Sequence, residues 1–142
     1  MKVFILILAV AIAGSLAFDP VFVDELEDLV PNKQDERELE ALDDDDEMIR
    51  STKKEKLDAI LARQSEFIQK RFKIEVEREK RRHQEKIEKK IAKAKDPQIK
   101  EFWKKIEEID NDMSLSENDA DIKEWELKSK LTPQQRKTLE KD

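Results

Sequence analysis

The sequence predicts an all-α protein: one long helix with three shorter helices packed back on it, preceded by a mostly disordered acidic leader. Three observations support this class. Charged residues make up 45% of the chain and apolar residues 37%, a balance close to the boundary between folded and disordered compositions. The only glycine is Gly14 and there is no cysteine, which excludes glycine-rich phosphate loops and disulfide frameworks. From residue 51 onward, apolar residues recur at helical spacing.

Residues 1–17 have the pattern of a secretory signal peptide. Lys2 precedes an unbroken apolar run, and Ser15 and Ala17 place small residues at the two positions that a signal peptidase reads. The run is too short to cross a membrane as a stable helix, and no later segment resembles a transmembrane span. We therefore expect a secreted, extracellular protein that begins at Phe18; an uncleaved membrane anchor is the alternative.

Residues 18–50 are predicted to form the disordered leader. They contain fourteen acidic residues against three basic ones, a net charge of −11. Pro31 interrupts any helix in this segment. Residues 43–47 are five consecutive acids, which repel one another and resist compaction. A metal-binding acidic loop is the functional alternative for this run.

Residues 51–142 are predicted to form one helical domain, which starts with a long helix at residues 51–95. This stretch has neither proline nor glycine, and Thr52 with Glu55 has the pattern of an N-terminal capping box. It carries sixteen basic residues against eight acidic ones, a net charge of +8. No apolar residue occurs at positions 77–86, so a coiled-coil heptad would be broken in the middle. An irregular coiled coil, with self-association through this helix, is left open.

Three shorter helices follow, at residues 97–109, 116–130 and 133–141. Asp96 before Pro97, and Thr132 before Pro133, are typical helix-start pairs. Short connections favour antiparallel neighbours, so the short helices should pack back on the long one. The predicted core places one set of apolar residues, Phe102, Trp103, Ile106, Ile122 and Trp125, against another, Phe72, Val76, Ile87 and Ile91.

The segment at residues 110–121 has the spacing of a twelve-residue calcium loop. Its candidate metal ligands are the oxygen-bearing side chains Asp110, Asp112, Ser114, Asp119 and Asp121. Leu115 stands where such a loop needs glycine for its sharp turn, and Ser114 with Glu117 also has the pattern of a capping box. We expect a polar connection between two helices; a weak magnesium or calcium site is the alternative.

The remaining residues argue against catalysis. His83 is the only histidine, which is too few for a metal centre or a catalytic triad, so we expect it on the helix surface or in a helix seam. Basic residues of the long helix alternate with glutamates, which disfavours nucleic acid. The sequence thus predicts a secreted, non-enzymatic binding or structural protein with an unknown extracellular partner. The alternative is a carrier of a lipid or other small apolar ligand, with Trp103 and Trp125 lining its cavity.

Residues 57–141 also resemble a known family. Residues 62–72 look like its "IKxxFxxF"-like helix start, and residues 82–87 are similar to its histidine-containing stretch. Residues 106–116 are similar to its segment of apolar residues, acids and "SLT", and residues 131–136 fit its closing turn. The family is that of secreted nematode antigens of the SXP/RAL type, which include an Anisakis allergen. The resemblance implies a secreted, non-enzymatic helical antigen with a proposed cation-binding domain.

Overall fold

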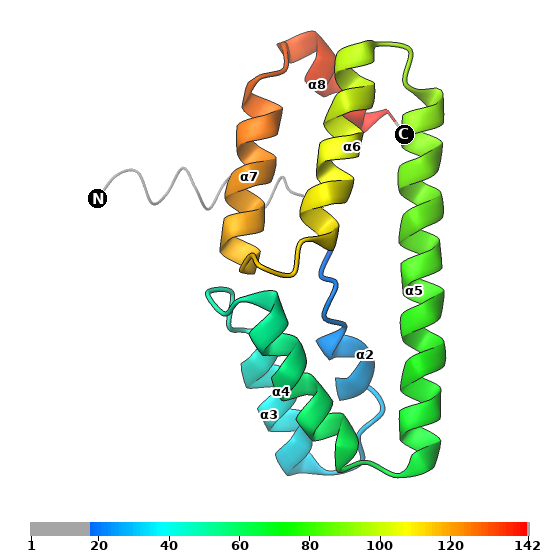
Figure 1. The fold of residues 1–142 in the computed structure, drawn as a ribbon, viewed down its shortest axis with the longest axis vertical. Coiled ribbons are helices and arrows are strands. Elements are labelled where there is room, and N and C mark those ends of the chain that lie inside the picture. The colour runs from blue at the N-terminus through cyan, green and yellow to red at the C-terminus, as the bar shows by residue number, and fades with distance from the viewer. Residues whose placement is uncertain (1–17, 142) are drawn as a thin grey trace, which may run out of the picture.

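The computed structural model describes residues 18–141, which form seven α-helices, so the predicted helical class is confirmed. The predicted signal peptide at residues 1–17 lies outside the described residues. The longest helix, α5 (Glu66–Lys93), runs the length of the molecule, and the other helices form two groups beside it (Figure 1). The first group is α2 (Val23–Glu27), α3 (Lys33–Asp43) and α4 (Arg50–Ala62); the second is α6 (Pro97–Asn111), α7 (Glu117–Ser129) and α8 (Pro133–Glu140).

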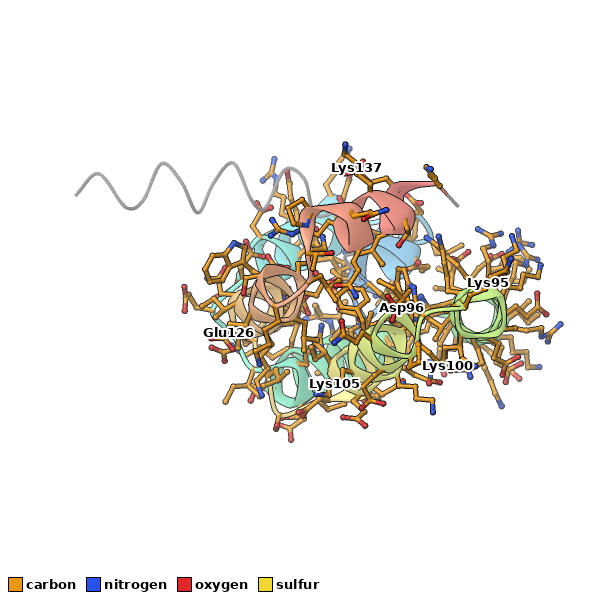
Figure 2. All side chains as sticks on the ribbon, turned by 90° about the horizontal axis from the view of Figure 1, so that it is seen from above. Lys95, Asp96, Lys100, Lys105, Glu126 and Lys137 are labelled. Carbon is orange, nitrogen blue, oxygen red and sulfur yellow. The ribbon has the colours of Figure 1, made fainter. Side chains whose placement is uncertain are left out.

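The three C-terminal helices agree within two residues with the predicted ones. The Asp96 carboxylate accepts a hydrogen bond from the backbone N–H of Gln98 at 2.8 Å and caps α6. Thr132 caps α8 through a capping box with Gln135, and Pro133 is its first residue. Figure 2, which looks down on α8, shows Asp96 where the chain passes from α5 into α6. The capping residues in the sequence therefore predicted these helix starts correctly.

The predicted long helix at residues 51–95 is replaced by two helices, α4 and α5. The Ser65 hydroxyl accepts a hydrogen bond from the backbone N–H of Ile68 at 3.3 Å and starts α5 afresh. The Gln64 side chain donates to the Ile60 carbonyl and to a carboxylate oxygen of Asp35 on α3. These two hydrogen bonds hold the turn between α4 and α5 against α3. The predicted Thr52 cap is also wrong, because α4 begins at Arg50 without a side-chain cap.

The prediction of a mostly disordered leader at residues 18–50 is corrected by the structure, which folds much of this segment into α2 and α3. Leu26 and Leu39 have no exposed surface, and they pack in one cluster with Leu57 of α4 and Phe72 of α5. Asp35 is the only acid of this segment that is buried. The other acids stay at least partly exposed, so their repulsion does not oppose burial of the few leucines.

A second core lies beside the C-terminal half of α5. Phe102, Trp103 and Ile106 of α6 are buried there against Ile87 of α5, as predicted. Phe72 belongs instead to the first core, while Val76 and Ile91 are only partly buried. The predicted burial of Ile122 and Trp125 is wrong, since they are 53% and 49% exposed. The reason is that α7 turns its opposite face inward, where Ala120 and Glu124 are buried.

Candidate functional site: an arginine-centred junction between two loops

Two helix–loop–helix pairs, α3–α4 and α6–α7, meet through their loops. The backbone N–H of Arg50 donates to the carbonyl oxygen of Leu115 at 2.8 Å. Ile49 and Ser116 form an isolated antiparallel β-bridge at the same place. Figure 1 shows the contact where α4 and α7 begin. The loops thus bring together residues that are more than sixty positions apart in the chain.

The side chain of Arg50 fills this junction and is only 1% exposed. Its Nε donates to Glu117 Oε1 at 2.6 Å, and its Nη1 donates to the carbonyl oxygens of Ile109 at 2.7 Å and Asp112 at 3.2 Å. Those carbonyls lie at the C-terminal end of α6, where the helix dipole favours a cation, whereas Glu117 lies in the first turn of α7, where it favours an anion. One guanidinium therefore links the end of one helix to the start of the next.

The beginning of the described chain is anchored at the same place. The carbonyl oxygen of Phe18 accepts a hydrogen bond from Arg50 Nη2 at 3.4 Å. The phenyl ring of Phe18 stacks on the imidazole ring of His83, with ring centroids 3.7 Å apart. His83 Nε2 in turn lies 2.8 Å from Asp110 Oδ2. Burial raises the pKa of Asp110, and the contact with His83 opposes that rise. His83 is thus a seam residue, one of the two placements that the sequence predicted.

A small cavity opens beside Arg50. It leaves about 10 Å³ for the centre of a water molecule, which is room for roughly one water. Its lining includes four carboxylates but one guanidinium, so negative groups outnumber positive ones. The carboxylates are those of Asp110, Glu117, Asp121 and Glu124.

Glu124 is the least satisfied group of this lining. It is 7% exposed, and its Oε1 has no hydrogen-bond partner among the described residues. Burial raises the pKa of Glu124 to about 7, Lys128 opposes that rise, and Asp110 adds to it. Partial burial also raises the pKa of Asp121 at the cavity. Because a buried carboxylate without a partner is costly, Glu124 is the group most in need of a proton or a cation.

The five predicted metal ligands are mostly engaged with neighbours. Asp110 contacts His83, and Asp112 Oδ1 accepts from both the backbone N–H and the hydroxyl of Ser114. Asp119 Oδ2 accepts from the backbone N–H of Ser116, so the capping box of α7 is Ser116–Asp119 and not the predicted Ser114–Glu117. Asp110 and Asp121 alone share the cavity. Between residues 18 and 141, no group of three His, Cys, Asp or Glu side chains is arranged to hold a metal. The magnesium or calcium site stays a prediction.

Sequence reasoning missed Arg50 and Glu124 as members of this site. One signal was present: Glu117, Asp121 and Glu124 are spaced by four and three residues, which places three acids on one face of α7. Arg50 offered a weaker signal, as the basic residue that ends a highly acidic segment.

Comparisons of the chain with protein-family models, with curated proteins and with solved structures find no match. Over the part of the chain that the structure covers, no helix has the length and apolar character needed to cross a membrane.

Proposed function

We propose that this chain is an exported, non-enzymatic helical protein that acts by binding an extracellular protein through the outer face of α7. The observation that carries the proposal is the exposure of Ile122 and Trp125, 53% and 49% respectively. They are three residues apart on one helix and so lie side by side on its surface. Tryptophan is the residue most enriched among those that dominate binding energy at interfaces.

The charges around this apolar pair suggest the chemistry of the partner. Helical spacing places Asp119 and Glu126 next to Ile122, and Asp121 and Lys128 next to Trp125, so three acids and one base surround the apolar pair. Figure 2 shows Glu126 on the outer side of α7, away from α5. A partner with an apolar pocket bordered by basic side chains complements this surface.

The contacts at the start of α7 make this helix suitable as a rigid binding element. The helix is held at its start by the Ser116–Asp119 capping box and by the bond between Arg50 and Glu117. A helix that is already ordered loses little conformational entropy when it binds. The arginine-centred junction is, in this proposal, the support of the binding surface and not a reaction centre.

Two other functions are less well supported. A carrier of apolar ligands would use its tryptophans to line a cavity, but Trp103 is 3% exposed and packs edge-on against Phe102, with ring centroids 5.2 Å apart. A cation site in the α6–α7 loop would need the side-chain oxygens of its acids, yet those of Asp112 and Asp119 already accept hydrogen bonds from the backbone N–H groups of Ser114 and Ser116. The resemblance to secreted nematode antigens agrees with export and with the absence of catalysis, and it leaves the partner open.

Photo-crosslinking from α7 tests the proposal. A photoreactive amino acid replaces Trp125 in one form of the exported chain, and Lys105, an exposed residue of α6, in a matched control. Both are irradiated in the extracellular fluid of the source, with and without a metal chelator. We expect one defined protein to be crosslinked from position 125 and not from position 105, with or without chelator. Excess parent protein should compete, whereas excess Ile122→Ala/Trp125→Ala should not.

Three results would count against the proposal. Equal crosslinking from both positions would show non-specific contact. Crosslinks between two copies of this chain would assign the α7 face to self-association. Loss of the crosslinked product in the presence of chelator would show that binding depends on a metal cation.

A further inference from the structure

The acidic cavity beside Arg50 contains a carboxylate that nothing in the described chain satisfies. Glu124 is 93% buried, and its Oε1 has no hydrogen-bond partner among residues 18–141. Arg50 does not fill this role, because its guanidinium already bonds Glu117 and the end of α6. A buried anion of this kind normally has a cationic or hydrogen-bonding partner.

The position of Phe18 suggests which group that partner is. Phe18 lines the same cavity as Glu124. Its carbonyl oxygen is bound by Arg50 and its ring is stacked on His83, so two points fix its orientation. The backbone nitrogen is bonded to the same Cα as the carbonyl carbon and the Cβ that carries the ring, so covalent geometry places it next to these two fixed groups.

Phe18 is also the residue at which the sequence predicts the exported chain to begin. Signal peptidase hydrolyses the bond between Ala17 and Phe18 by adding one water molecule. The carboxylate of Ala17 leaves with residues 1–17, and the Phe18 nitrogen becomes a primary amine. A free α-amino group has a pKa of about 7.7–8.0 and is mostly protonated at neutral pH.

We propose that the α-ammonium group released at Phe18 docks in this cavity and pairs with the Glu124 carboxylate, so that signal-peptide removal completes the junction. The inference rests on the export that is part of the proposed function. An ammonium group is about the size of the water for which the cavity has room. It also adds a second cation to a lining that has four carboxylates and one guanidinium. A metal is the weaker candidate, since no set of three ligands is arranged for one in the described chain.

The test compares two forms of the exported chain, residues 18–142, which differ only at the Phe18 nitrogen: one has a free amine and the other is acetylated. Each is made as the parent, as Glu124→Gln, and as Glu126→Gln, a control on the outer side of the same helix. Melting temperature at pH 7 is the first measurement. The rate at which cyanate carbamylates the α-amine, relative to a short peptide of the same N-terminal sequence, is the second.

We expect acetylation to lower the melting temperature by about 4 °C in the parent and in Glu126→Gln, and by less than 1 °C in Glu124→Gln. The α-amine of the folded parent should react about tenfold more slowly than that of the peptide, because pairing with a carboxylate raises the pKa of the amine and only the unprotonated amine reacts with cyanate. Glu124→Gln should restore the peptide rate. The reaction rate keeps the test informative even where a variant melts early.

The outcomes separate this inference from the proposed function. Equal melting temperatures of the free and acetylated parent, or equal effects of acetylation in all three backgrounds, would overturn the pairing. An exported chain whose mass shows that it begins at another residue would overturn the predicted cleavage and the pairing with it. Failure of crosslinking from position 125, with pairing intact, would overturn the binding surface alone.

Discussion

Buried charge at single residues sets the chemistry of this molecule. Arg50 and Lys53 are 1% and 0% exposed, which is rare for such side chains. Arg50 is compensated by five hydrogen bonds, two of them to one carboxylate. Lys53 Nζ lies 3.4 Å from the carbonyl oxygen of Asp43. Glu124 differs from both, because one of its oxygens lacks any partner in the described chain.

The raised pKa of Glu124 predicts a specific pH dependence for a chain whose Phe18 nitrogen is blocked. The pKa is about 7 in the folded state and 4.5 in the unfolded state, so the folded state holds the proton more tightly. Its contribution to stability is therefore full below pH 4.5 and is lost as the pH rises to about 7. At pH 8, Glu124→Gln should be more stable than the parent by roughly 3 kcal/mol, and at pH 4 the two should be nearly equal. Urea unfolding across this range measures the difference.

Glu126→Gln serves as the matched control, because Glu126 is exposed on the same helix. Its unfolding free energy should follow the parent within about 0.5 kcal/mol at every pH. If the curves of Glu124→Gln and the parent run parallel from pH 4 to pH 8, Glu124 does not titrate with a raised pKa.

At the scale of elements, side-chain caps decide where helices begin. The sequence offers a continuous helical pattern across residues 51–95, and Ser65 ends it by capping a new helix. In the α6–α7 loop two serines compete for one cap. Ser116 is 3% exposed and caps α7, whereas the exposed Ser114 bonds only Asp112.

This difference predicts unequal effects of removing the two hydroxyl groups. Ser116→Ala should lower the free energy of unfolding by about 1 kcal/mol, because it leaves an N-terminal N–H of α7 without its acceptor. Ser114→Ala should change it by less than about 0.5 kcal/mol, since Ser114 is exposed and water can replace its hydroxyl as the donor to Asp112. Urea denaturation of the two variants and the parent gives both values. A larger loss in Ser114→Ala would mean that the predicted Ser114 cap is the real one.

At the scale of the whole molecule, α5 joins two cores that share no buried residue. The first core depends on the acidic segment at residues 18–50, and the second on α6. The two tryptophans have different surroundings: Trp103 is 3% exposed and Trp125 is 49% exposed.

Replacing each tryptophan by alanine therefore should have very different effects. Trp103→Ala removes a buried indole and should cost about 3–5 kcal/mol, a large part of the stability of a small domain. Trp125→Ala should cost less than about 1 kcal/mol, because its face of α7 is in water. Thermal melting of both variants checks the pair. Similar losses would place Trp125 in the core, as the sequence suggested, and would remove the proposed binding surface.

The sequence by itself determined the helical class, the caps at Asp96 and Thr132, and the burial of Phe102, Trp103 and Ile106. These features depend on residues within one or two helical turns of each other, and such local patterns can be recognised in a single sequence. The apolar residues of α6 also recur at a regular helical spacing, so the sequence predicts without ambiguity which face of this helix is buried.

The tertiary structure alone decided the folding of the acidic segment, the face that α7 buries, and the junction at Arg50. The leucines of residues 18–50 are too few to form a core locally and are buried by α4 and α5. The inward face of α7 carries Glu124, and the outward one Trp125, the reverse of what hydrophobicity alone predicts. Arg50 and Glu117 are sixty-seven residues apart. Their pairing depends on how two loops meet, and no local spacing in the sequence encodes that contact.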